Sequence, residues 1–169
     1  MIYQTASREN GRLVVGDLVP FSFRLYSEPS GMPLYLMIGD SKHSLLEIKV
    51  DKESGVVIGV TLTLFAHPIS HRVPEGLISV SRENGWISYD VNEWQGARRD
   101  EHNNFSLFRT PDKYFLIFQD FPRSTKCVVG ARIGFFIASN RLCGIEFFDL
   151  TQEELSALDK LWSRSRPTS

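Results

Sequence analysis

The densest group of side chains suited to contact with another molecule lies in ENGWISYDVNEWQGARRDEHNN, residues 83–104. Two tryptophans and four acids occur within the 16 residues 86–101 of this stretch, which is too long and too polar for a minimal hairpin turn. An aromatic side chain can anchor a protein interface by excluding water, while acids at the rim steer a basic partner. The residues that this pattern predicts to bind a partner are Trp86, Asp90, Glu93, Trp94, Asp100 and Glu101.

Alternation along a strand that starts at Trp86 places Trp86, Ser88 and Asp90 on one face, where an aromatic ring lies among polar groups, and Ile87, Tyr89 and Val91 on the other, which is then the core face. A second interpretation of the same stretch is purely structural. Tryptophan is mostly buried on average, so Trp86 and Trp94 could instead cover the edge of the core. The sequence leaves both interpretations open.

Residues suited to catalysis or metal binding are scattered rather than clustered. His67 and His71 have the spacing of a helical zinc site, but Pro68 lies between them, which favours a polar loop. Cys143 sits in an apolar run without a local histidine, and neither G-x-S-x-G nor a phosphate-binding glycine loop occurs. We therefore expect a protein that is not an enzyme and that uses no metal or cofactor.

Length and composition indicate one globular domain, residues 1–169. The 169 residues are 42% hydrophobic and 23% charged, which suits a chain with one good hydrophobic core. The formal net charge of −1 provides no global basic field, so no nucleic-acid partner is expected. The oligomeric state is left open.

Features of a secreted or membrane protein are missing from the sequence. No run of about 18 apolar residues occurs, and the start, MIYQTASRENGR, lacks the charged and apolar regions of a secretory signal. Cys127 and Cys143 each lie in an apolar run, which is typical of buried, reduced thiols. We expect a cytoplasmic protein with no membrane partner.

The elements that must position these residues are mostly strands. The clearest hairpin joins Leu45–Val50 to Val56–Phe65 through DKESG, where Asp51 can cap the turn and Gly55 can adopt positive φ. The segment 151–164 predicts a helix. Thr151 and Glu154 form a capping box there, and an apolar face follows, made of Leu155, Leu158, Leu161 and Trp162.

The chain also shows signs of an internal repeat, spanning 7–66 and 81–155. SRENG occurs at 7–11 and again at 81–85, and a hairpin pattern follows each copy. True duplication would give two β-rich halves around a shared core. The alternative is chance identity, together with the physical similarity of all hairpins.

Aligning Gly59 with Gly144 places Ile48 on Ile133 and predicts that Ser139-Asn140-Arg141 is a hairpin turn. Asn140 suits it because asparagine tolerates a left-handed backbone. The same alignment also pairs Val50 with Phe135, Ser54 with Ser139, Val60 with Ile145 and Leu62 with Phe147.

Two stretches, LLEIKVDKESGVVIGVTLTL (45–64) and RIGFFIASNRLCGIEFFDLTQEEL (132–155), resemble sequences of small immunity proteins from bacterial contact-dependent and related polymorphic toxin systems. Together they cover about a quarter of the chain. The resemblance implies a cytosolic protein that binds and neutralises one cognate toxin domain, with no catalytic residues to carry over. The near-neutral charge departs from the acidic character of many nuclease immunity proteins and argues against a nuclease target.

The sequence therefore predicts an α+β fold, mainly antiparallel β, with a C-terminal helix and two pseudo-repeated halves as one option. The predicted function is inhibition of a toxin by direct binding. The alternative function is binding of a small molecule or peptide in a cavity between sheet and helix.

Overall fold

The structure is a computed structural model, and it confirms an α+β fold made mostly of strands with one C-terminal helix. Two six-stranded, mainly antiparallel sheets and a two-stranded sheet are formed within the described residues. The residues that the structure describes are 2–4, 11–16, 19–25, 31–74, 76–77, 80–118, 121 and 125–164.

The first sheet has the strand order β2-β3-β6-β5-β4-β9. Its strands are β2 (Gly11–Val14), β3 (Phe21–Leu25), β6 (Val57–Phe65), β5 (Ser44–Val50), β4 (Leu34–Gly39) and β9 (Arg98–Glu101). The predicted hairpin is confirmed as β5 and β6. Asp51 Oδ1 accepts hydrogen bonds from the Ser54 backbone N–H and hydroxyl, both at 2.8 Å, and Gly55 has φ +71°.

The second sheet repeats this arrangement in the order β10-β11-β14-β13-β12-β7. Its strands are β10 (Phe105–Arg109), β11 (Tyr114–Phe118), β14 (Arg141–Phe147), β13 (Ile133–Ala138), β12 (Lys126–Gly130) and β7 (Ser81–Asn84). In both sheets a hairpin precedes a three-stranded meander, and the last meander strand pairs with the hairpin. In both, the sixth strand runs parallel to the first strand of the meander.

The two meanders share an irregularity that fixes their alignment. A β-bulge lies just before Gly59 in β6 and just before Gly144 in β14. When paired residues are counted from this bulge in each half, Ile48 corresponds to Phe135. Ile48 pairs with Val60, and Phe135 pairs with Ile145. The predicted match with Ile133 is therefore wrong, although the glycines do correspond.

The misalignment arises from turns of different length. β13 and β14 are joined by Ser139 and Asn140 alone, with φ 48° and 60°, which is the backbone of a tight primed turn. The Asn140 turn is thus confirmed, whereas the Asp51 turn between β5 and β6 is longer. The two copies of SRENG do not stand at equivalent places in the two halves. The first copy ends at Gly11, where β2 begins, whereas the second copy lies before β8 and β9. Residues 7–10 lie outside the described residues.

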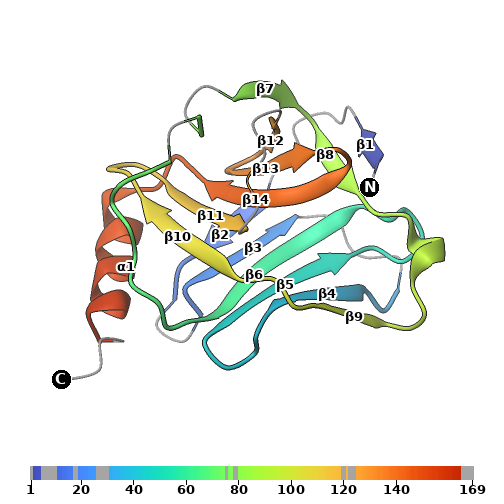
Figure 1. Cartoon of the computed structure of the whole chain (residues 1–169), viewed down its shortest axis with the longest axis horizontal. Coiled ribbons are helices and arrows are strands. Elements are labelled where there is room, and N and C mark those ends of the chain that lie inside the picture. The colour runs from blue at the N-terminus through green and yellow to red at the C-terminus, as the bar shows by residue number, and fades with distance from the viewer. Residues whose placement is uncertain are drawn as a thin grey trace.

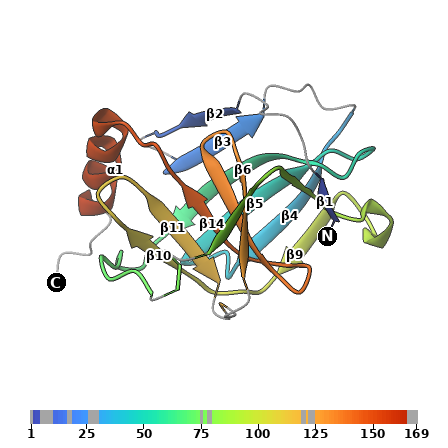
Figure 2. The ribbon, with the colours of Figure 1, turned by 90° about the horizontal axis from the view of Figure 1, so that it is seen from above.

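The two sheets lie face to face and share one hydrophobic core (Figures 1 and 2). Phe21 of the first sheet stacks on Phe147 of the second, with ring centroids 4.5 Å apart. Phe65 and Phe105 make a second stacked contact between the sheets at 5.7 Å. These aromatic contacts join the two halves in one core.

The helix α1 (Gln152–Arg164) packs against one end of the sandwich (Figure 1). The predicted capping box is present, since the Thr151 backbone N–H donates to Glu154 and the Glu154 N–H donates to the Thr151 hydroxyl. Leu155 and Leu158 are buried, and Trp162 meets Phe65 edge-on. In the described part of the chain, no helix is long and apolar enough to cross a membrane.

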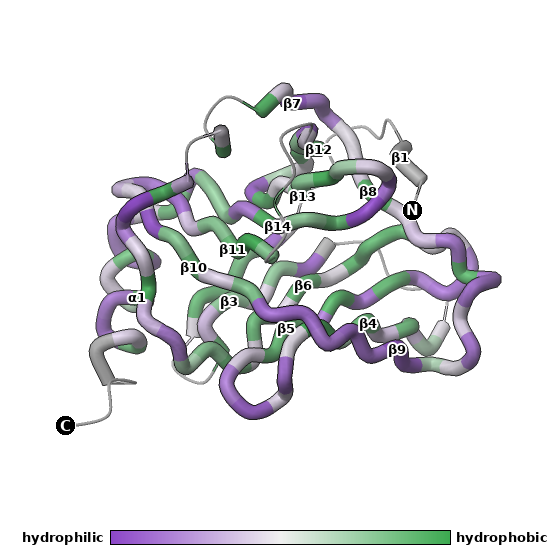
Figure 3. The backbone as a smooth tube through the Cα atoms, viewed as in Figure 1, coloured by the Kyte–Doolittle hydropathy of each residue, from purple (hydrophilic) through white to green (hydrophobic). Residues whose placement is uncertain are grey.

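The outer faces of the two sheets differ. The outer face of the second sheet is apolar and is covered by Val73, Leu77 and Val80 from the connection after β6. The outer face of the first sheet instead mixes polar and apolar side chains, because the half-exposed positions of β4 and β5 are Tyr35, Met37, Leu45, Glu47 and Lys49. The segment around β9 is largely hydrophilic (Figure 3). Cys127 and Cys143 form no disulfide and are buried beneath the covered face, as predicted.

Candidate functional site

The segment predicted to bind a partner runs from β8 (Trp86–Ser88) through the short 3-10 helix η1 (Val91–Glu93) to β9. β8 pairs with β1 (Ile2–Gln4). Asp90 caps η1 by accepting hydrogen bonds from the backbone and side-chain N–H groups of Asn92, both at 3.0 Å. The chain thereby turns away from the core at the end of the sandwich opposite α1 (Figure 1).

Trp86 belongs to the core and not to a surface. It is only 5% exposed, and its ring lies between Phe23 and Phe135 of the two sheets. The indole N–H donates to the Val57 carbonyl, and a side chain at Gly130 would collide with the ring. All of β8 is buried, so the predicted alternation of a core face and a polar face is wrong there.

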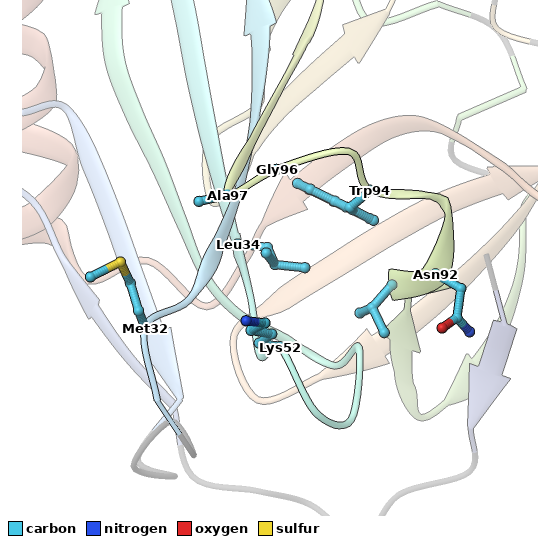
Figure 4. Close-up of a pocket in the computed structure, with 8 residues that line it drawn as sticks. Met32, Leu34, Lys52, Asn92, Trp94, Gly96 and Ala97 are labelled. Carbon is cyan, nitrogen blue, oxygen red and sulfur yellow. The ribbon is translucent and has the colours of Figure 1, made fainter.

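Trp94 is half-buried and lines a hollow of about 450 Å³ (Figure 4). Its Nε1 atom is buried and has no hydrogen-bond partner among the described residues. The ring meets Tyr89 edge-on at 6.5 Å. The residues that line the hollow are Met32, Leu34, Lys52, Val91, Asn92, Trp94, Gly96 and Ala97.

The hollow is assembled from three parts of the chain that are distant in sequence. Met32 and Leu34 lead into β4, Lys52 comes from the β5–β6 turn, and the remaining residues surround η1. Gly55 holds the turn against η1, because a side chain there would strike the Tyr89 carbonyl at 2.2 Å. The Tyr89 N–H donates to the Gly55 carbonyl at 2.8 Å.

The sequence did not predict that Met32 and Lys52 belong to this site. Met32 is 77% exposed, which is unusual for so large an apolar side chain, and it stands in the SGMP turn. Pro and Gly identify that turn, but nothing local indicates that it approaches η1. Lys52 lies in the β5–β6 turn, where Asp51 alone accounts for the turn, so the sequence did not single out Lys52.

The four predicted acids separate into two pairs. Asp90 and Glu93 are exposed beside the hollow. Asp100 instead forms an ion pair with Arg98 at 2.7 Å, and Glu101 with Arg99 at 3.1 Å, both along β9. Because surface ion pairs screen each other's charge, Asp100 and Glu101 offer less negative potential than the sequence suggested.

Burial affects the hydroxyl group of Tyr89, whose ring contacts Trp94 beside this site. Desolvation raises the pKa of Tyr89 above its ordinary value of 10, and the nearby Glu101 carboxylate raises it further. The phenol therefore stays neutral at physiological pH and acts as a support for Trp94.

A partly buried ion pair lies on the covered face of the second sheet. Arg82 donates two hydrogen bonds to the fully buried Glu146, at 2.5 and 2.8 Å. The Cys127 thiol lies 3.5 Å from the same carboxylate. Burial raises the pKa of Cys127, and Glu146 raises it further, so this thiol is unreactive and the cluster is structural.

The two histidines of the AHPISHR stretch are exposed in the loop after β6. The described residues contain no group of three or more His, Cys, Asp or Glu side chains that could hold a metal ion. No family model matches this chain, and no curated protein is significantly similar to it.

Proposed function

We propose that this protein is a cytosolic, non-enzymatic binding protein that neutralises a cognate bacterial toxin domain by direct contact. The contact surface in this proposal is the hollow lined by Trp94, with Asp90 and Glu93 at its rim. Trp86 is excluded because it is buried in the core.

The observation that carries this proposal is the state of Trp94. The half-buried ring lines the hollow and offers apolar surface to a partner, whereas its Nε1 atom is buried out of a partner's reach. Met32 adds exposed apolar surface at the mouth of the hollow. Aromatic anchors that fill or flank such hollows dominate the energetics of protein interfaces.

The rim acids favour a basic partner surface. Asp90 and Glu93 lie beside the hollow, whereas Asp100 and Glu101 are already opposed by arginines. The rim charge mainly changes the rate of association and its dependence on salt. A toxin domain with a lysine or arginine beside an apolar side chain fits this arrangement.

The alternative, a small-molecule or peptide site, is favoured by one observation. A hollow of about 450 Å³ falls within the volume range of small-ligand sites. It lies at the end of the sandwich opposite α1, and not between sheet and helix where the sequence placed it.

The proposal is tested with the toxin domain encoded beside this gene. Co-expression should restore growth to cells that produce the toxin domain, and the purified proteins should form a complex in calorimetry. If the neighbouring gene encodes no toxin, or if the two proteins do not associate, the proposed function is wrong.

Trp94→Ala should weaken that complex by at least about 2 kcal/mol, or roughly 30-fold in Kd, if Trp94 is an anchor. Its effect on thermal stability should be smaller than its effect on binding. Glu153→Ala, on α1 at the other end, is the control and should leave the affinity unchanged. Unchanged affinity of a folded Trp94→Ala variant would place the surface elsewhere and leave toxin binding itself intact.

A further inference from the structure

Strand register places four basic side chains in one row across the outer face of the first sheet, with Gly59 and Tyr35 at the two other positions. Each member faces the next through a register pair, from β2 at one edge to β9 at the other. We call it the basic row, and its residues in order are Arg12, Arg24, Gly59, Lys49, Tyr35 and Arg98.

Two of these cations lack a counter-charge. Lys49 forms an ion pair with Glu47 at 3.4 Å, and Arg98 forms one with Asp100 at 2.7 Å. These two acids therefore oppose the charges of two of the four cations. Arg12 and Arg24 are exposed, directly opposite each other, and form no ion pair within the described part of the chain. Like charges placed directly opposite on a sheet destabilise it, so a fold with no use for the pair would gain by losing it.

Comparison with the second sheet supports a role in binding. The positions that correspond to Arg12 and Arg24 are Ser106 and Ile117, which also face each other. That outer face is covered by the chain itself, with Leu77 packed on Ile117 and its neighbours. The first sheet has the same topology, yet it carries paired arginines where the second sheet has the exposed Ser106 and the buried Ile117.

We propose that the basic row binds an acidic segment of a protein partner, with carboxylates seated on the Arg12–Arg24 pair. Two guanidinium groups side by side present planar donors that match carboxylates in bidentate geometry. Six strands spaced by about 4.8 Å give a row roughly 24 Å long, which an extended peptide of about eight residues spans. This surface is separate from the Trp94 hollow and does not depend on the partner being a toxin.

Tyr35 favours a protein segment over single-stranded nucleic acid. A base would need the free face of an aromatic ring for stacking. The ammonium of Lys49 lies 5.6 Å from the centre of the Tyr35 ring, and the Lys49 stem passes over Gly59.

The experiment uses a fluorescent oligo-glutamate peptide of about eight residues and a thymidine oligonucleotide of similar length, titrated with the full chain at low salt. The peptide should bind, and its affinity should fall as salt is raised. The double variant Arg12→Gln/Arg24→Gln should weaken peptide binding by about tenfold or more, because it removes charge-assisted hydrogen bonds.

The matched control is Arg72→Gln/Arg141→Gln, which removes the same charge from exposed positions outside the first sheet. It should keep most of the peptide affinity. An equal loss in both double variants would show that net charge alone acts and would overturn the proposal. Preferential binding of the oligonucleotide, or no binding of the peptide, would also overturn it.

A stability measurement separates binding from folding. The Arg12→Gln/Arg24→Gln variant should have a melting temperature equal to or above that of the unmodified chain, because it relieves a like-charge contact. A lower melting temperature would mean that the arginines support the fold, and the proposed role in binding would then be wrong.

Discussion

At the scale of single residues, Gly134 allows a charged side chain to cross the covered face of the second sheet. It faces Glu146 across the β13–β14 pair, and the Glu146 side chain lies over it. A methyl group at Gly134 would stand 2.7 Å from the Glu146 side chain and 2.9 Å from the Cys127 sulfur. All of these atoms are buried and have little room to move.

Gly134→Ala should therefore destabilise the protein by about 1–3 kcal/mol, as overpacking of a filled interior does. Denaturant unfolding followed by circular dichroism measures the change. Gly31→Ala is the control, because a methyl group there meets no described atom within 4 Å. If the two substitutions had equal effects, crowding around Glu146 would not be the cause.

The two tryptophans of the predicted binding segment have different roles, and the cause lies outside their local sequence. Trp86 and Trp94 stand in the same polar stretch, and the sequence treated them alike. Trp86 is fixed in the core by the carbonyl of Val57 and the absent side chain of Gly130, both far away along the chain. The capping residues Thr151 and Glu154 were predictable, because both partners lie within one helical turn.

At the scale of elements, α1 depends on its apolar face. Leu158 is fully buried in the shared core. Leu158→Ala should cost about 2–5 kcal/mol, the range of core leucine truncations. The free energy of unfolding from a denaturant titration checks this value. A loss below about half a kcal/mol would mean that the helix does not pack as described.

The N-terminus of α1 should respond to pH. Burial acts to raise the pKa of Glu154, but hydrogen bonds from the Arg132 guanidinium and the Thr151 backbone outweigh it, so the pKa lies below its ordinary value of 4.5. A carboxyl with a lowered folded-state pKa contributes stability above the unfolded pKa and loses it as the pH falls toward the folded value.

Glu154→Gln should thus destabilise the protein at pH 7, by about 1–2 kcal/mol for charge-assisted hydrogen bonds. The difference from the unmodified chain should shrink as the pH falls below about 4.5. Melting curves of both proteins over this pH range measure it. Glu153→Gln, at an exposed neighbour, should show a smaller difference at pH 7. A difference that stays constant with pH would contradict the role of the Glu154 charge.

Elements held by local patterns were predictable, and those held by distant pairing were not. The β5–β6 hairpin and α1 carry their own turn and capping residues. β7 and β9 are short, hydrophilic edge strands that pair in parallel with strands far away along the chain. Along β6, buried positions alternate with more exposed ones at Val60 and Leu62. A bulge then shifts the alternation, so that Phe65 is buried and Leu64 is not.

At the scale of the whole molecule, the connection between the repeated halves ties both sheets together. After β6 it covers the outer face of the second sheet and adds β7 to its edge. It then passes through β8, adds β9 to the first sheet and enters the second sheet as β10. Each half therefore completes its sheet with a strand from the connection.

This arrangement predicts that the two sheets unfold together. The inner faces of both sheets, together with β8 and α1, form one shared core, and Phe21 and Phe147 stack between the sheets with ring planes 4° apart. Signals from secondary structure and from tryptophan environment should therefore give one coincident denaturant transition. Two separated transitions would show that the halves fold independently.

A double-mutant cycle measures the link between the sheets directly. Phe21→Leu and Phe147→Leu keep apolar volume at both positions but remove the ring stack. Their effects on the free energy of unfolding should be non-additive, with a coupling of about 0.5–1.5 kcal/mol, the value of an aromatic pair beyond its buried area. The control pair is Phe21→Leu with Phe136→Leu, because Phe136 lies in the separate cluster on the covered outer face. That pair should be additive within about 0.5 kcal/mol, and equal coupling in both cycles would mean that the substitutions act through general loosening of the core.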